Sequence, residues 1–330
     1  AMDFASILSA EYADNMMKAG TPEKVDLNPI GTGPFQLQQY QKDSRILYKA
    51  NDKYWGKKPD IDRLVFSITP DASVRYAKLQ KNECQAMPYP NPADIAKMKQ
   101  NNDIQLLEQP GLNVGYISFN VEKKPLDNQK VRQALEYAVD KEGIAQGILA
   151  GSEKVADTLM ARSVPYCDFD SPTYIYQPEK AASLLEEEGW LLPAGKTVRE
   201  KQGKPLQLLL SYNVNNAVEK EIAELLQDDF KKIGVALTVL GEEKQAFLDR
   251  QKSGDFDLQY SLSWGTPYDP ASFVSSFRIP AHADYQGQKG LANKAQLDAM
   301  IGELLITPDE HRRQTLILLG SFPFGSVLCF

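Results

Sequence analysis

Residues 206–264, LQLLLSYNVNNAVEKEIAELLQDDFKKIGVALTVLGEEKQAFLDRQKSGDFDLQYSLSW, decide the fold class of this chain. Apolar, β-prone runs alternate here with segments whose apolar residues recur at helical spacing. The expected strands are 206–214, 235–241 and 256–264, and the expected helices are 217–234 and 244–254. Strands that alternate with helices pair in parallel through right-handed crossovers. The stretch therefore predicts an α/β lobe.

The beginning of the chain has a different character. Between residues 31 and 70, short runs of β-branched and aromatic residues are bounded by Gly, Pro and Asp, which is typical of strands joined by turns. The glycines of residues 31–35, GTGPF, predict a tight turn into a strand, because the third glycine of a dinucleotide fingerprint is missing. Helices are expected at 73–83 and 91–101, the second with Asn91 as N-cap and Pro92 at its first position.

The middle of the chain sets the expected division into lobes. Residues 111–121 alternate as a strand does, and residues 125–151 form a strong helical pattern with one stripe of Val131, Leu135, Ala138 and Val139. A second helix is expected at 178–190. A chain of 330 residues exceeds what one core usually serves. We therefore expect a partial first lobe at 1–121, ending in a hinge strand, and a second lobe at 122–316.

Residues 317–330, ILLGSFPFGSVLCF, form an apolar tail with no charge and no helical or alternating period. The tail is too short to span a bilayer. A shifted reading frame or an assembly break is the simplest explanation for it. The first residues lack the order of a signal peptide, and no stretch of the chain is apolar for the length of a membrane span.

Composition and charge exclude several classes of function. The net charge of −7 and the absence of a sustained basic run argue against a nucleic-acid partner. The three cysteines lie far apart, which argues against a zinc or thioredoxin-type site and leaves buried or unpaired thiols. No H-E-x-x-H, G-x-S-x-G or Walker motif occurs, and there are two histidines, so the sequence favours a protein that is not an enzyme.

Residues 261–286 are the most informative segment for function. They follow an expected strand, so Trp264 lies at its carboxyl end, where ligand clefts form in open α/β sheets. Trp264 and Tyr268 offer flat apolar walls, Arg278 a fork for carboxylates, and His282 an imidazole suited to a metal. The alternative is that the aromatics belong to the core, that Arg278 forms a surface ion pair and that His282 lies in a loop or cap.

The sequence resembles the peptide and nickel family of extracellular solute-binding proteins of ABC importers, up to about Leu316. Its order of GTGPF, YW and VRQAL carries the resemblance, within residues 28–66 and 125–144. The resemblance implies the two-lobed Venus flytrap fold of type II, incomplete here, and a periplasmic protein that works as a monomer with a permease in the inner membrane. It also implies a chain truncated at both ends and a missing partner for Cys84.

Within the family, the two halves of the chain resemble different members. Residues 1–141 are similar to dipeptide-binding members, and residues 155–316 are similar to nickel-binding members. Dipeptide binders hold the peptide amine with an Asp three residues after the strand-end Trp, where this chain has Pro267. Their carboxylate-binding Arg has no counterpart in residues 211–220, SYNVNNAVEK. Nickel binders share W-G-x-P-Y and the histidine that corresponds to His282.

The expected function is capture, between two lobes, of a small-molecule ligand, namely nickel or a similar metal with an organic chelator such as histidine. Trp264, Tyr268 and Arg278 would contact this ligand, His282 would contact the metal, and no covalently bound cofactor is expected. A dipeptide or oligopeptide is the alternative ligand. A hydrolase acting in the same cleft and a fragment without function are alternatives of other classes.

Overall fold

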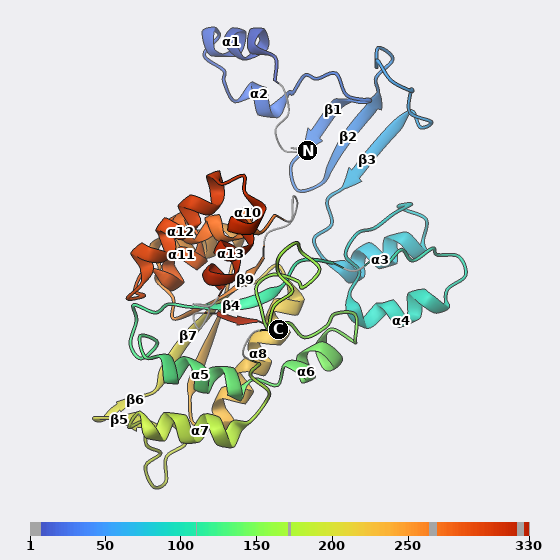
Figure 1. The fold of residues 1–330 in the computed structure, drawn as a ribbon. Coiled ribbons are helices and arrows are strands. Elements are labelled where there is room, and N and C mark those ends of the chain that lie inside the picture. The colour runs from blue at the N-terminus through green and yellow to red at the C-terminus, as the bar shows by residue number, and fades with distance from the viewer. Residues whose placement is uncertain (1–7, 110, 171–172, 264–268, 322–326, 330) are drawn as a thin grey trace. The chain divides into compact units, whose positions relative to one another are not determined.

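A computed structural model describes residues 8–109, 111–170, 173–263, 269–321 and 327–329 (Figure 1). The chain forms two compact units, Ala1–Gln100 and Asn101–Phe330. The strand that we expected to end the first lobe is β4 (Gly115–Phe119), and it belongs to the sheet of the second unit. The lobe boundary at residue 121 and the hinge role of this strand stay predictions.

The first unit contains a three-stranded antiparallel sheet of β1 (Phe35–Gln41), β2 (Arg45–Ala50) and β3 (Arg63–Ser67). The predicted turn at residues 31–35 leads into β1, as expected. The side-chain amide of Asn51 fixes this turn by donating a hydrogen bond of 2.9 Å to the carbonyl oxygen of Gly33. Asn51 thereby ties the start of β1 to the end of β2.

The helices of the first unit are α1 (Ala10–Lys18), α2 (Lys24–Leu27), α3 (Ala72–Gln80) and α4 (Pro92–Gln100). The predicted N-cap of α4 is confirmed, because Oδ1 of Asn91 accepts a hydrogen bond of 3.1 Å from the backbone N–H of Ala93.

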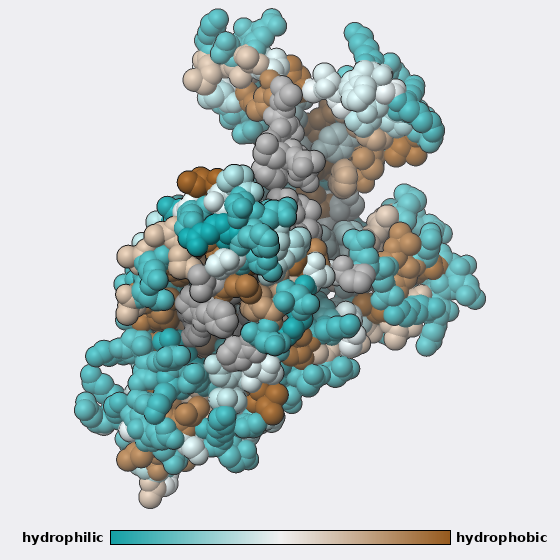
Figure 2. Space-filling view, in the orientation of Figure 1, coloured by the Kyte–Doolittle hydropathy of each residue, from teal (hydrophilic) through white to brown (hydrophobic). Residues whose placement is uncertain are grey.

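The first unit buries little apolar surface. Among its described residues, the buried hydrophobic side chains are Ala50, Tyr76 and Met98. Val65 and Phe66 of β3 remain 52% and 53% exposed, and apolar side chains gather over β3 in Figure 2. Almost all of the described apolar core therefore lies in the second unit.

The second unit is built on a five-stranded mixed sheet in the order β10-β4-β9-β7-β8. Strands β7 (Gln207–Asn213), β8 (Ala236–Glu242) and β9 (Leu258–Leu262) pair in parallel, which confirms the α/β prediction. Strand β4 is antiparallel to β9 and to β10 (Val327–Cys329). The short strands β5 (Glu200–Lys201) and β6 (Lys204–Pro205) form a separate hairpin.

Helices connect the parallel strands as predicted. Helix α8 (Ala217–Lys232) links β7 to β8, and α9 (Lys244–Ser253) links β8 to β9. Leu208, Leu210 and Tyr212 alternate along β7 and pack in the main core with residues of α8. The same core includes residues of α5 (Gln129–Ala138) and α7 (Pro178–Glu187), which lie side by side in Figure 1.

The single long helix predicted over residues 125–151 is wrong in its length. Helix α5 ends at Ala138, and a short α6 (Lys141–Gly143) continues into a π-helical turn at Ile144–Ile148. The side chain of Asp140 causes the restart, because its Oδ1 accepts a hydrogen bond of 2.9 Å from the backbone N–H of Gly143. The predicted apolar stripe is confirmed, since all four of its residues are at most 1% exposed.

The C-terminal part contains helices that the sequence analysis missed. These are α10 (Pro270–Ser275), a 3-10 turn at Ser276–Arg278, α11 (Ala283–Gln288) and α12 (Lys294–Ile306). Residues of α10, the 3-10 turn and α12 form a second apolar core with residues of α13 (Glu310–Ser321) and of the long connection between residues 149 and 177.

Residues 317–330, for which the sequence shows no helical or alternating period, form regular structure where they are described. Helix α13 continues through residue 316, and Leu316 and Ile317 are 2% and 1% exposed in the second core. Strand β10 adds to the sheet beside β4. None of the helices in the described part of the chain is long and apolar enough to cross a membrane.

Leu210 tests the importance of the central parallel strand. It is completely buried and pairs with Val239 of β8 and Leu258 of β9. Leu210→Ala should lower the free energy of unfolding by about 2 to 5 kcal/mol through lost burial and a residual cavity. Urea unfolding followed by circular dichroism measures this. Leu192→Ala, at a position 48% exposed, is the control and should change stability by less than about 0.5 kcal/mol. Equal losses of stability in the two variants would contradict the placement of Leu210 in the core.

Candidate functional site

A cavity of about 200 Å³ lies at the carboxyl ends of the parallel strands β7 and β9. This is the edge of an open α/β sheet at which ligands bind. The lining comes from β4, β7, α8, α9, β9 and the start of α11. The described lining residues are Tyr116, Asn213, Glu219, Phe247, Leu248, Gln251, Tyr260, Ser261, Leu262, His282, Ala283 and Asp284.

The chain immediately before Trp264 is firmly held. The backbone N–H of Ser263 donates to the carbonyl oxygen of Val114 at 2.8 Å, and Oγ of Ser263 accepts from the N–H of Val114 at 2.7 Å. The side chain of Asn113 donates to the carbonyl oxygen of Ser263 at 2.7 Å. These bonds extend the pairing of β4 with β9 as far as the last described residue before Trp264.

One of the predicted site residues lines this cavity. His282 is partly buried, precedes α11 as its N-cap residue and contributes to the wall. Arg278 is exposed at the end of the 3-10 turn, and its guanidinium lies beside Gly302 of α12. It is not among the described residues that line the cavity. Trp264 and Tyr268 lie outside the described residues, so their predicted role stays a prediction.

Glu219 is a cavity residue that the sequence analysis missed. It lies in the first turn of α8, whose N-cap Asn216 accepts a hydrogen bond of 3.1 Å from the N–H of Val218. Its Oε2 accepts from the backbone N–H of Asn213 at 3.0 Å, and its Oε1 accepts from the amide of Asn216 at 3.1 Å. Burial raises the pKa of Glu219 to about 7, although these two hydrogen bonds oppose the shift. The N-x-x-E spacing of a capping box was the available signal.

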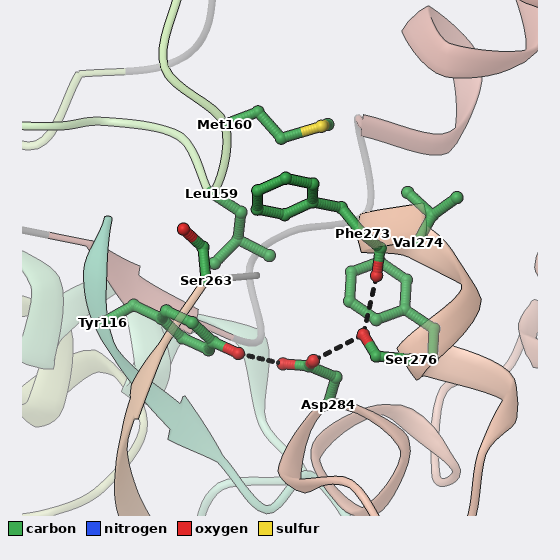
Figure 3. Close-up of a pocket in the computed structure, with 9 residues that line it drawn as sticks. Tyr116, Leu159, Met160, Ser263, Phe273, Val274, Ser276 and Asp284 are labelled. Carbon is green, nitrogen blue, oxygen red and sulfur yellow. Dashed lines mark hydrogen bonds between the residues drawn. The ribbon is translucent and has the colours of Figure 1, made fainter. Parts of the chain in front are cut away.

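Asp284 is a second buried carboxyl on the cavity wall. The hydroxyl of Tyr116 donates to its Oδ1 at 2.6 Å, and Oγ of Ser276 lies 2.6 Å from its Oδ2, as Figure 3 shows. Burial raises the pKa of Asp284, and the bonds from Ser276 and Tyr116 and the nearby His282 oppose the shift. The carboxyl joins β4, the 3-10 turn and α11, and it thereby fixes the backbone that presents His282.

The small cavity drawn in Figure 3 is not a second ligand site. Its volume is about 10 Å³, and its walls include Leu159, Met160, Phe273 and Phe277. A volume of this size holds at most about one water molecule. It is a packing gap beside the Tyr116–Asp284–Ser276 contacts, so the larger cavity remains the candidate site.

The described residues do not form a metal cage. Among them, no group of three His, Cys, Asp or Glu side chains is placed to hold a metal ion. A metal that arrives with its own chelator needs a single imidazole, so the expected role of His282 stays a prediction. Cys84 and Cys167 are free thiols, and burial raises the pKa of Cys167 to about 12, which keeps it protonated.

Comparison with known proteins gives consistent matches. Residues 2–285 match the family model described as "Bacterial extracellular solute-binding proteins, family 5 Middle". The dipeptide-binding protein of Escherichia coli (strain K12) is 56% identical over 277 residues, which cover 84% of this chain and 50% of that protein. The nickel-binding periplasmic protein of the same organism is 41% identical over 294 residues, which cover 87% of this chain and 56% of that protein.

A solved structure agrees with these matches. NikA from Brucella suis in complex with Fe(III)-EDTA superposes with a TM-score of 0.84 at 35% identity, covering 91% of this chain and 62% of NikA. The predicted fold of a periplasmic binding protein is therefore confirmed for the part present. The chain spans about half the length of the curated relatives it matches.

Tyr116 tests whether the Asp284 contacts hold the site together. Tyr116→Phe removes one donor from a buried carboxyl and should lower the free energy of unfolding by about 1 to 3 kcal/mol. Guanidinium chloride unfolding measures the change. Tyr89→Phe, at a position 84% exposed, is the matched control and should stay within about 0.5 kcal/mol of wild type. An unchanged Tyr116→Phe variant would disprove the structural role of this bond.

The pKa of Glu219 predicts a pH dependence of stability. Because it is raised from 4.5 to about 7 in the folded chain, folding favours the protonated form. The contribution of Glu219 to stability is complete below pH 4.5 and is lost as the pH rises through about 7. Relative to Glu219→Gln, wild type should lose up to about 3 kcal/mol across this window. Urea unfolding at several pH values measures this, with Glu221→Gln on the exposed side of α8 as control. A stability difference between wild type and Glu219→Gln that does not change with pH would refute the raised pKa of Glu219.

Proposed function

Because this chain belongs to family 5 of the bacterial extracellular solute-binding proteins, we propose that it is the substrate-binding component of an ABC importer and that it captures a short peptide. The observation that carries the proposal is the 56% identity with a dipeptide-binding protein across 84% of this chain. This similarity favours the peptide over the nickel complex that the local motif around His282 led us to expect.

The chemistry of the cavity suits binding without reaction. A nucleophilic serine needs a base within hydrogen-bond distance. Ser261 has a cavity-lining hydroxyl, and its buried Oγ has no hydrogen-bond partner among the described residues. This supports capture and release of an unchanged ligand over hydrolysis. The ligand would then pass to a permease in the inner membrane, and the protein would act in the periplasm as a monomer.

A nickel complex with a small chelator is the second candidate ligand. It is favoured by the position of His282 on the cavity wall and by the 41% identity with a nickel-binding periplasmic protein. An imidazole at this position can complete the coordination of a metal whose other ligands come from the chelator.

Isothermal titration calorimetry of the whole chain separates the two ligands. We expect saturable binding of L-alanyl-L-alanine at pH 7 and no heat of binding with nickel in excess L-histidine. Mass spectrometry of the dipeptide after incubation should show it intact, whereas cleavage would indicate a hydrolase.

Binding of nickel in excess L-histidine without binding of the dipeptide would make the metal complex the ligand instead of the peptide. In that case His282→Ala should abolish the nickel–histidine signal, because it removes the metal-contacting imidazole. His311→Ala, which changes an exposed histidine on α13, is the matched control and should retain the signal.

A further inference from the structure

The cavity at the ends of β7 and β9 has an acidic interior. Two of its lining residues are carboxylic acids, Glu219 and Asp284, which are 6% and 5% exposed. No Lys or Arg occurs among the described lining residues. Burial removes the solvation of a carboxylate, and at Glu219 no Lys or Arg of the described lining offsets that cost. A positively charged ligand group would reduce this cost.

Glu219 still has acceptor capacity for such a group. Each of its oxygens receives one hydrogen bond from the chain, from Asn213 or from Asn216. A carboxylate oxygen has two acceptor positions, so one on each oxygen remains. The two existing bonds hold the carboxylate in place at the start of α8, which prepares it for an incoming N–H donor.

Ser261 is a second and independent indication of a missing donor or acceptor. Its Oγ is buried, lines the same cavity and has no hydrogen-bond partner in the described part of the chain. Buried hydroxyl groups in native structures are almost always paired. An N–H group of a ligand inside the cavity would supply the partner.

The cavity also has apolar lining residues, and two of them lie away from its acidic interior. Leu248 and Leu262 are 38% and 55% exposed, so these two leucines lie where the cavity meets solvent, whereas the two acidic residues are buried. Lysine and arginine side chains have an apolar stem and a cationic end. In a cavity of about 200 Å³, the apolar stem of such a side chain would contact the two leucines, and its cationic end would contact Glu219.

We propose that this cavity receives the cationic side chain of a lysine or arginine residue of the ligand, with Glu219 as the residue that selects for its charge. The proposal rests on the proposed peptide function and adds a preference within it. It assigns to Glu219 a specificity role beyond its part in capping α8.

Proton release should accompany this recognition. The groups around Glu219 are Asn213 of β7, Asn216 of the α8 cap and the phenol of Tyr260 on β9, with His282 and Asp284 elsewhere on the wall. Because the pKa of Glu219 is about 7 in the empty cavity, a bound cation lowers it and expels a proton. Affinity for a cationic ligand should therefore rise with pH through 7, and ionisation of Asp284 would act in the same direction.

The test uses calorimetry of the whole chain with L-alanyl-L-arginine and L-alanyl-L-citrulline, whose side chains differ mainly in charge. Wild type should prefer the arginine dipeptide by about tenfold or more. Glu219→Gln should reduce that ratio to near one, and Glu221→Gln should keep it. Titrations in two buffers of different ionisation enthalpy should show proton release with the arginine dipeptide that Glu219→Gln abolishes.

Further measurements keep the outcomes distinct. Agmatine, a guanidinium compound without a peptide bond, tests the cavity separately from peptide binding. If both dipeptides bind wild type equally and agmatine does not bind, the charge selection is refuted and the peptide function stands. If agmatine binds through Glu219 while neither dipeptide binds, the cavity assignment stands and the peptide function is refuted. If nothing binds, both are refuted.

Ser261→Ala is the second variant and should weaken arginine-dipeptide binding about threefold or more.

Discussion

The parallel pairing of β7 with both β8 and β9 is the constraint on which the second unit depends. Parallel neighbours need crossover helices, and α8 and α9 supply them. The crossovers bring the carboxyl ends of β7 and β9 to one edge of the sheet, so Asn213, Leu262 and the start of α8 surround a common cavity. Leu210, on the central strand β7 of this arrangement, is completely buried in the main core.

Much of this architecture could be predicted from local sequence patterns. Alternation and helical spacing located β7, α8, β8, α9 and β9, and the Asn91–Pro92 pair located the start of α4. Spacing could not reveal that the Asp140 side chain would start a new helix, because the apolar stripe continues through Val139. Helices α10 and α11 were missed because residues 261–286 were interpreted for their ligand-binding side chains, and no element was predicted over residues 294–306, where α12 lies.

The site was less predictable, because it depends on contacts between distant residues. The bond from Tyr116 to Asp284 joins positions 168 residues apart, which no local pattern reports. His282 could be identified from a short motif, yet the same kind of local argument favoured nickel, whereas a dipeptide-binding protein is the more similar of the two relatives across most of the chain. Glu219 lies within the helix expected over residues 217–234, and its N-x-x-E spacing from Asn216 can indicate a helix start but not a buried acid.

The order of strands in the second sheet has a consequence for how the chain is made. Strand β4 is the first strand of that sheet to leave the ribosome, and its two neighbours, β9 and β10, are the last. Both edges of β4 thus stay unpaired while the helices and strands between them are synthesised, and an unpaired edge is open to association with other chains. Completion of this sheet is therefore a late step, in which nearly the whole unit must close on its first strand.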